Sequence, residues 1–229
     1  MTAPAAPAPQ AASAFSLMRA LGVVSAICGL IIVAAYLVTL DRAKANRRLA
    51  AERAVFKVLP SAKSVREFQA LASGDIVPAV AGDAPPGAIK FYAAYDAAGK
   101  FAGVAAEGAA KGYADTVRVM FGYGQSCQCI VGLGVVSMRE TPGIGDKILT
   151  DKDFLANFKA LDVRLKADLS ALANEVKVVK HGTKSQAWQI DAISGSTVTS
   201  RAVGRGINQA AEALLPRLVP KLGQLETQR

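Results

Sequence analysis

The longest run of apolar positions lies near the start of the chain, from Ala20 to Leu40, where none of the 21 residues is charged. At about 1.5 Å per residue, a helix of this length spans about 31 Å, which matches the hydrocarbon core of a bilayer. A cleaved signal peptide is the competing interpretation, but its apolar region is usually only about 7–15 residues long and its start is more basic. We therefore predict an uncleaved transmembrane anchor over residues 14–40, after a flexible Ala/Pro-rich tail over residues 1–13.

The next residues form a mixture of Ala, Arg, Lys and Glu that favours helix. We predict that residues 41–58 continue the anchor out of the bilayer as a helical stalk. Leu59-Pro60 ends it, because the residue before a proline disfavours helix. Five basic residues lie in or next to this stalk: Arg42, Lys44, Arg47, Arg48 and Arg53. By the positive-inside rule, this charge would place the following domain, residues 59–229, in the cytoplasm.

Strand-like runs dominate the middle of the chain. Residues 88–95 and 100–108 flank the turn at Asp96–Gly99 and predict a hairpin. Further predicted strands cover residues 116–122 and 128–138, and residues 176–180 with 185–190 predict a second hairpin. Helices are expected at residues 153–159 and 200–222. These elements predict an α+β fold, with an antiparallel sheet and flanking helices rather than a βαβ alternation.

The net charge of +9, from 27 Lys and Arg against 18 Asp and Glu, adds little to this picture. Aromatic residues are few and are not interleaved with the basic ones, so we expect membrane-surface and partner electrostatics rather than nucleic-acid binding. Pairs of glycines in a G-x-G spacing occur, but none lies in a βαβ unit with a third glycine, so a Rossmann site is not supported. His181, the single histidine, is expected on a surface loop, and no catalytic acid/base set surrounds it.

Two of the three cysteines, Cys127 and Cys129, form a C-x-C pair. A zinc or iron–sulfur site needs about four ligands, so this pair cannot build one alone and no metal site is predicted. We expect both cysteines to be small buried residues on a strand. A redox role, or a metal role through ligands of a partner, stays open.

The stretch from Asp191 to Arg201 is rich in small and hydroxylated residues and joins a strand-like run to a helical pattern. A strand that turns through Ser-Gly-Ser-Thr into a helix presents free backbone N–H groups and a positive helix end, which favours anion binding. A simple N-cap by Ser or Thr is the alternative.

A second short motif, Glu140-Thr-Pro-Gly-Ile-Gly145, follows a predicted strand directly. Pro-Gly favours a tight turn, and a hairpin or loop turn is one interpretation. Gly145 could instead let the backbone approach a flat ligand closely.

Together these motifs resemble a known family. Asp-Ala-Ile-Ser-Gly-Ser-Thr is similar to the Asp-Gly-x-Ser/Thr-Gly-Ala-Thr motif of the covalent FMN-binding subunits of Rnf and Na⁺-pumping NADH:quinone oxidoreductase complexes. Ala192 and Ser196 depart from that pattern, and Ser196 adds a hydroxyl beside the acceptor. Glu-Thr-Pro-Gly-Ile-Gly resembles the family's Glu-Thr-Pro-Gly-Leu-Gly loop, which lines the isoalloxazine pocket, and Gly112-Tyr113 resembles an upstream Gly-Tyr segment.

The resemblance implies that Thr197 carries FMN through a phosphoester bond. The other cofactor-binding residues that it implies are Ser194, Gly195, Ser196, Val198, Thr199, Glu140, Thr141, Pro142, Gly143, Ile144, Gly145 and Tyr113. It implies an electron-transfer subunit of an Rnf-type, ion-translocating ferredoxin:NAD⁺ oxidoreductase in the bacterial inner membrane, with no catalytic acid/base residues of its own. Its partners would be the other membrane subunits and a flavin transferase, which takes FMN from FAD. The FMN domain would face the periplasm, against the charge rule.

Three alternatives remain open at this point. The chain could be the homologous C subunit of the Na⁺-translocating NADH:quinone oxidoreductase. It could be a standalone membrane-anchored flavin module that senses redox state. It could also be a structural protein in which Ser-Gly-Ser-Thr is only a helix cap, in which case the preparation would be colourless.

Overall fold

A computed structural model describes residues 13–79 and 85–227. The chain divides into two compact units, Met1–Arg48 and Leu49–Arg229. The expected tail, residues 1–13, lies outside the described residues except for its last position. Each unit is described by itself below.

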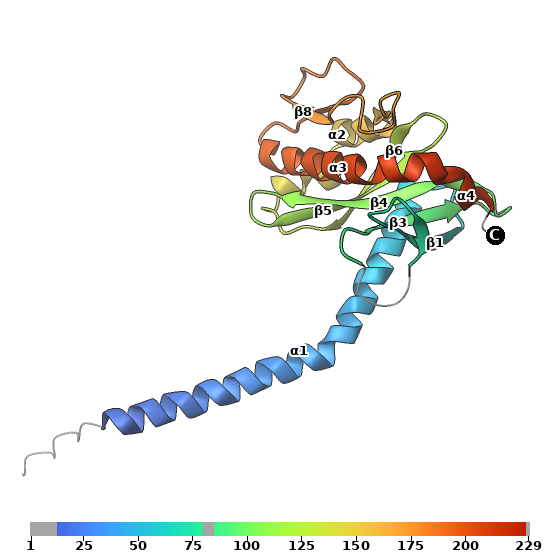
Figure 1. Cartoon of the computed structure of the whole chain (residues 1–229). Coiled ribbons are helices and arrows are strands. Elements are labelled where there is room, and N and C mark those ends of the chain that lie inside the picture. Colours follow the sequence, from blue (N-terminus) through green and yellow to red (C-terminus); the bar gives the residue numbers. More distant parts are fainter. Residues whose placement is uncertain (1–12, 80–84, 228–229) are drawn as a thin grey trace, which may run out of the picture. The chain divides into compact units, whose positions relative to one another are not determined.

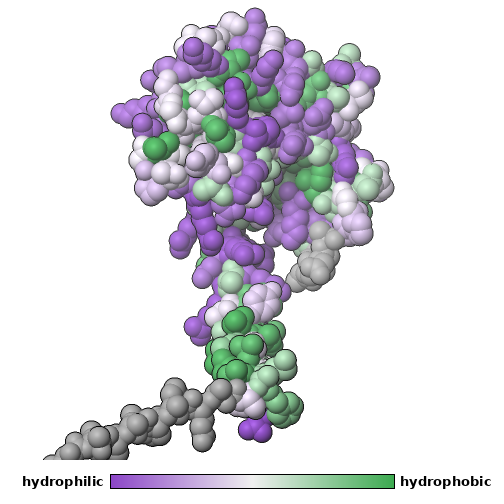
Figure 2. Space-filling view, turned by 90° about the vertical axis from the view of Figure 1, so that its left-hand side faces the viewer, coloured by the Kyte–Doolittle hydropathy of each residue, from purple (hydrophilic) through white to green (hydrophobic). Residues whose placement is uncertain are grey.

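The first unit contains most of helix α1 (Ala14–Val58). From Phe15 to Val38 its large apolar side chains are exposed, and Figure 2 shows them as a predominantly green stretch of surface. A helix that is apolar on all sides and uncovered by protein is suited to a lipid environment. Among the described residues, α1 is the one helix long and apolar enough to cross a membrane, by length and composition.

The C-terminal end of α1 belongs to the second unit, where Ala51, Ala54, Val55 and Val58 are buried. They pack with Ala94, Ala105 and Met120 on one face of a sheet. Gly132 makes this approach possible, because a Cβ atom there would lie 2.5 Å from the carbonyl oxygen of Val58. Residues 49–58, which were expected to form part of a separate stalk, are therefore part of the folded domain.

The second unit is built on a seven-stranded sheet in the order β2-β1-β3-β4-β5-β6-β7, and every neighbouring pair is antiparallel. The strands are β1 (Ser64–Ala70), β2 (Ile76–Pro78), β3 (Ile89–Tyr95), β4 (Phe101–Lys111), β5 (Thr116–Gly124), β6 (Cys129–Ser137) and β7 (Leu161–Asp162). The predicted α+β class and the hairpin β3–β4 are confirmed.

Helix α3 (Thr197–Leu218) lies along the sheet, as Figure 1 shows in orange-red across β4. It buries Val203, Ile207 and Leu214 in the larger core, which also contains Val104 and Ala106 of β4. Ala105, between these two residues, belongs to the cluster around the end of α1. Because neighbouring strand residues point to opposite faces, α3 and the end of α1 cover the two faces of the sheet.

The remaining elements are short: η1 (Gly145–Leu149), α2 (Lys152–Ala156), η2 (Asn157–Lys159), β8 (Lys177–Val179), β9 (Gln189–Asp191), η3 (Val219–Lys221) and α4 (Leu222–Thr227). The predicted second hairpin is wrong, because β8 and β9 pair in parallel. Apolar alternation identifies a strand but not the direction of its partner, so the pattern could not settle this point. Helix α3 also begins at Thr197 rather than at the expected residue 200.

Candidate functional site

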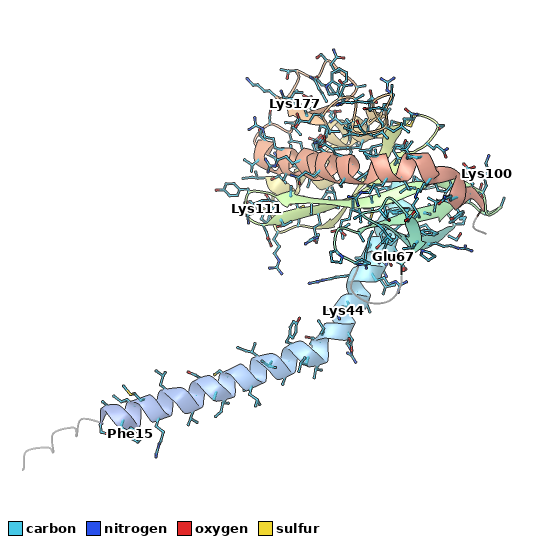
Figure 3. All side chains as sticks on the ribbon, in the orientation of Figure 1. Phe15, Lys44, Glu67, Lys100, Lys111 and Lys177 are labelled. Atoms are coloured by element: carbon cyan, nitrogen blue, oxygen red, sulfur yellow. A yellow bond between two sulfur atoms is a disulfide. The ribbon has the colours of Figure 1, made fainter. Side chains whose placement is uncertain are left out.

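The two motifs meet at one cavity of about 460 Å³, although they are far apart in the sequence. The turn between β4 and β5 supplies Tyr113, the loop after β6 supplies one wall, and the start of α3 supplies the other. The lining residues are Tyr113, Glu140, Thr141, Ile144, Gly145, Gly195, Ser196, Thr197, Val198 and Thr199. Lys111, the last residue of β4, marks this end of the sheet in Figure 3. The volume lies within the range of about 300–1,000 Å³ that is usual for small-molecule sites.

Glu140 joins all three segments of this cavity. Its carboxylate accepts hydrogen bonds from the backbone N–H groups of Tyr113, Ala114 and Asp115 at 3.3, 3.2 and 3.4 Å. The hydroxyl of Thr199, in the first turn of α3, donates a further bond of 2.8 Å. Burial raises the pKa of Glu140, but these four hydrogen bonds to the charged form outweigh it, so the pKa lies below its ordinary value. Glu140 is therefore an ionised clamp between the loops and the helix.

Two glycines make room for that clamp. A Cβ atom at Gly112 would lie 2.5 Å from an oxygen of Glu140, and one at Gly145 would lie 2.5 Å from its Cβ atom. Gly145 is also buried. Gly145 lines the cavity, as a ligand-facing position would, and its lack of a side chain also accommodates the Glu140 side chain.

The tight turn predicted at Pro142-Gly143 is present. The carbonyl of Thr141 accepts hydrogen bonds from the N–H groups of Ile144 and Gly145, and Gly143 has a φ angle of 75°. Pro142 and Gly143 are exposed on this turn and do not line the cavity.

Helix α3 starts with an open N-terminus. Ser196 is the N-cap residue, yet its side chain makes no capping hydrogen bond. The first intrahelical bond runs from the N–H of Ser200 to the carbonyl of Ser196, so the amides of Thr197 to Thr199 precede the ladder. Gly195, with a φ angle of 80°, turns the chain into the helix. The simple side-chain cap considered above is thus not formed by Ser196, and the amides remain available to a ligand.

Two residues that the sequence motifs did not indicate hold this turn. The hydroxyl of Ser200 accepts from the N–H of Ile193 at 3.1 Å and donates to the carbonyl of Ser196 at 2.9 Å. The buried side chain of Asn157 pairs with both backbone groups of Asp191. The Asn157 contacts join residues that are 34 positions apart, and the Ser200 contacts depend on how the chain turns into the helix. The local sequence carries no signal for either set.

The hydroxyl groups of the motif differ in access. Ser196 and Thr199 are each 3% exposed, and Thr199 already donates to Glu140. Ser194 is exposed but lines a different cavity. Thr197 is half-buried and lines the cavity shared by the two motifs. Among these hydroxyls, that of Thr197 is both partly exposed to solvent and located on the cavity shared by the two motifs.

The rim of the cavity is apolar. Tyr113, Ile144 and Val198 are 73%, 50% and 46% exposed. A cluster of exposed apolar side chains beside a cavity marks a binding surface. This rim is suited to a flat aromatic ligand, whereas the helix N-terminus behind it is suited to an anion.

A second cavity, also about 460 Å³, lies on the other side of the motif. Its lining contains three aspartates, Asp151, Asp153 and Asp191, against one lysine, Lys147, and this excess of negative charge disfavours an anionic ligand. Asp191 accepts two hydrogen bonds from the N–H of Gly182 and lies 3.5 Å from Nδ1 of His181. In the part of the chain that the structure describes, no cluster of three or more His, Cys, Asp or Glu residues could hold a metal ion.

The expectation of two buried cysteines on a strand holds for Cys129 but is wrong for Cys127, and it missed the bond between them. Cys127 and Cys129 form a disulfide, in which Cys127 is exposed in a turn and Cys129 is buried at the start of β6. The C-x-C spacing is compatible with such a bond, but the apolar residues after it favoured a buried strand.

Comparison with known proteins agrees with this geometry. Residues 112–212, which contain Tyr113, the Glu140 loop and the start of α3, match the FMN-binding domain family. The resemblance drawn from the motifs is therefore confirmed at the level of the family.

Two relatives, both subunits of ion-translocating complexes, match this chain over different lengths. The G subunit of the ion-translocating oxidoreductase complex of Methanosarcina acetivorans is 26% identical over 83% of this chain and 88% of its own length. The G subunit of the Na⁺-translocating ferredoxin:NAD⁺ oxidoreductase complex of Acetobacterium woodii is 32% identical, over 46% of this chain and 45% of the relative. The match thus spans most of the first relative and about half of the second.

Solved structures share the fold. NqrC of Shewanella oneidensis is 20% identical, with a TM-score of 0.54 over 82% of this chain and 98% of that protein. The C subunit of the Na⁺-translocating NADH-quinone reductase of Parabacteroides distasonis gives the same values. At this identity, the likeness shows the fold alone.

Proposed function

We propose that this protein is an electron-transfer flavoprotein subunit of a membrane-bound, ion-translocating oxidoreductase complex of the Rnf type. FMN is its cofactor, joined to Thr197 by a phosphoester bond. The relatives that are G subunits of ion-translocating oxidoreductase complexes support the role in a complex, and the FMN-binding domain supports the cofactor. The other membrane subunits of the complex and a flavin transferase are the partners that this role requires.

The residues of the cavity fit the two halves of FMN. Tyr113, Ile144 and Val198 offer an apolar surface to the isoalloxazine ring. The free amides at the start of α3 and the positive end of the helix dipole stabilise the phosphate. Bound FMN supplies the electron transfer, and the protein supplies its position and surroundings.

The observation that carries the attachment site is the access of the Thr197 hydroxyl. Esterification by a second protein needs a hydroxyl that is reachable from solvent. Thr197 is the half-buried hydroxyl at the cavity, whereas the neighbouring Ser196 is buried. Although Ser196 adds a hydroxyl that the family pattern lacks, it is too buried to compete, so we assign Thr197 as the acceptor.

Glu140 contributes to the site by holding other residues of the protein in place. Its ionised carboxylate fixes the Thr199 end of the helix and the backbone around Tyr113. In this way it holds the apolar rim and the anion-binding amides in one arrangement.

The disulfide supports an outward orientation of the domain. Disulfides form and persist in the periplasm and are rare in the cytosol. The basic residues after the anchor argue for the opposite orientation, but that rule weakens when a long domain follows the span. We therefore assign α1 as a single-pass anchor in the inner membrane, with the FMN-binding domain on the periplasmic side.

Two matched variants test the attachment. The full-length chain, produced together with a flavin transferase and run on a denaturing gel, is expected to fluoresce. Thr197→Val should abolish the fluorescent band, whereas Ser196→Ala should retain it at the wild-type intensity. A fluorescent Thr197→Val band would refute the ester at Thr197, and loss only in Ser196→Ala would move it to Ser196.

A further inference from the structure

The Cys127–Cys129 disulfide lies at the end of the domain opposite the FMN-binding cavity. Its turn joins β5 to β6, and these strands run from this turn toward the Glu140 loop. In Figure 3, Lys100 at the start of β4 and Lys111 at its end mark the two ends of the sheet. The register places the last residues of β5 beside the first part of β4, so the disulfide lies at the Lys100 end. A strand of nine residues spans about 30 Å, so the disulfide is not a flavin contact.

This disulfide contributes little to folding. It closes a loop over one intervening residue, whereas the entropic stabilisation from a disulfide grows with the length of the closed loop. The two strands are also paired along their length without it, from Arg118 with Ser137 to Gly124 with Cys129. Stabilisation of the fold is therefore a poor explanation for the disulfide.

The local geometry favours chemical exchange instead. The sulfur of Cys127 is carried by an exposed turn, whereas Cys129 is 5% exposed, so an attacking thiol has access from one side. Between them, Gln128 has a φ angle of 50°, a conformation that non-glycine residues seldom adopt. Exposed or strained disulfides are the more easily reduced ones.

The turn also borders a recess that can receive a partner. A cavity of about 570 Å³ lies between residues 100–103 and residues 124–126, immediately before Cys127. The reduced state is accommodated as well, because the sulfur of Cys127 lies 3.6 Å from the carbonyl oxygen of Gly124. This oxygen is an acceptor within reach of the Cys127 thiol once the bond is reduced.

We propose that Cys127–Cys129 is a thiol–disulfide exchange site for a partner protein that carries a reduced cysteine pair. One partner thiolate attacks the sulfur of Cys127, forms an intermolecular disulfide and displaces the Cys129 thiolate, which takes up a proton. The second partner thiol loses its proton and attacks the partner sulfur of the mixed disulfide, which releases Cys127 as a thiol. The partner pair is oxidised to a disulfide, and Cys127 and Cys129 gain two electrons and two protons. This activity is separate from the FMN-binding site and does not depend on it.

The first test uses the native cysteine pair in the full-length chain, in detergent, with Cys28→Ser to remove the third cysteine. The folded protein is equilibrated with reduced and oxidised glutathione, quenched with acid and labelled with a maleimide that shifts the band on a gel. We expect both thiols to appear without denaturant at millimolar reduced glutathione. A pair that is reduced only after unfolding would overturn the proposal.

The second test examines which sulfur is attacked. In the same background, Cys129→Ser leaves the exposed cysteine and Cys127→Ser leaves the buried one. With oxidised glutathione, the Cys127 thiol should form the mixed disulfide about tenfold faster or more, because access limits the exchange. A thioredoxin that lacks its resolving cysteine, mixed with the native pair, should be trapped on Cys127. Equal rates for the two variants, or no trapped adduct, would refute attack at this turn.

Discussion

At the scale of single residues, Glu140 connects the parts of the site that are distant in sequence. Four donors from two segments converge on its carboxylate. Glu140 packs against Gly112 and Gly145, where any side chain would collide with it. Hydrogen bonds to a charged group are stronger than those between neutral groups. Glu140 therefore stabilises both the domain and the geometry of the cavity that we propose binds FMN.

Replacing Glu140 with Gln keeps its size but turns an NH₂ group toward N–H donors. We expect the free energy of unfolding at neutral pH to fall by about 1–3 kcal/mol, the usual result of leaving such groups unsatisfied. The folded-state pKa of Glu140 lies below its ordinary value of 4.5. The stabilisation is therefore complete above pH 4.5 and is lost as the pH falls through the lower, folded-state pKa. Urea denaturation of both proteins across this range measures the effect.

Glu107→Gln serves as the control for that variant. Glu107 forms a surface ion pair of 2.9 Å with Arg118, and such pairs contribute at most about 1 kcal/mol. If the two variants were equally stable, or if the Glu140→Gln difference did not shrink in acid, the clamp would be refuted.

Many residues of the site could be predicted at this scale, but the hydrogen bonds and packing contacts between them could not. The family motifs indicated Thr197, Tyr113 and the Glu140 loop, and the structure brings them to one cavity. They did not indicate that Gly145 accommodates Glu140, or that Ser200 and Asn157 hold the turn at Ser196 and Asp191. These contacts depend on elements that meet only in the folded chain, so a local pattern carries no signal for them.

At the scale of elements, the position of α3 on the sheet sets the position of Thr197. Gly108 of β4 and Gly206 of α3 are in direct contact, and a Cβ atom at Gly108 would lie 2.5 Å from the carbonyl oxygen of Gly206. Backbone rather than a flexible side chain is in the way, so the helix must move to accept one. Strands β3 to β6 and this helix follow from their apolar patterns, whereas β1, β2 and β7 were not predicted. The direction of β8 against β9 does not, because a three-residue strand has no pattern that distinguishes its neighbours.

Gly108→Ala is expected to destabilise the domain by about 1–3 kcal/mol, as overpacking usually does, and to lower FMN loading through displacement of the helix. Gly223→Ala on α4 is the matched control, because a Cβ atom there meets nothing within 4 Å. Alanine in an open helical position should be neutral or stabilising. Thermal unfolding and the flavin absorbance per chain check both, and equal behaviour of the two variants would contradict the contact described above.

At the scale of the whole molecule, one chain contains an apolar helix and a segment that matches the FMN-binding domain family. The basic residues that follow the anchor and the disulfide of the domain argue for opposite orientations, and we give the disulfide more weight.

Reporter fusions after Arg229 test this orientation. Alkaline phosphatase, which needs an oxidising compartment for its own disulfides, should be active when fused there, whereas a reporter that works only in the cytoplasm should be inactive. A fusion after residue 13 should give the reverse pattern. Activity of the cytoplasmic reporter after Arg229 would place the domain inside the cell.

The central claim is that Thr197 carries FMN, and the mass of the protein tests it most directly. The full-length chain, produced together with a flavin transferase, should have the mass of the polypeptide plus FMN minus one water. Fragmentation of the peptide that contains Asp191 to Arg201 should place that addition on Thr197. An unmodified mass under these conditions, or an addition on Ser194, Ser196 or Thr199, would contradict the account.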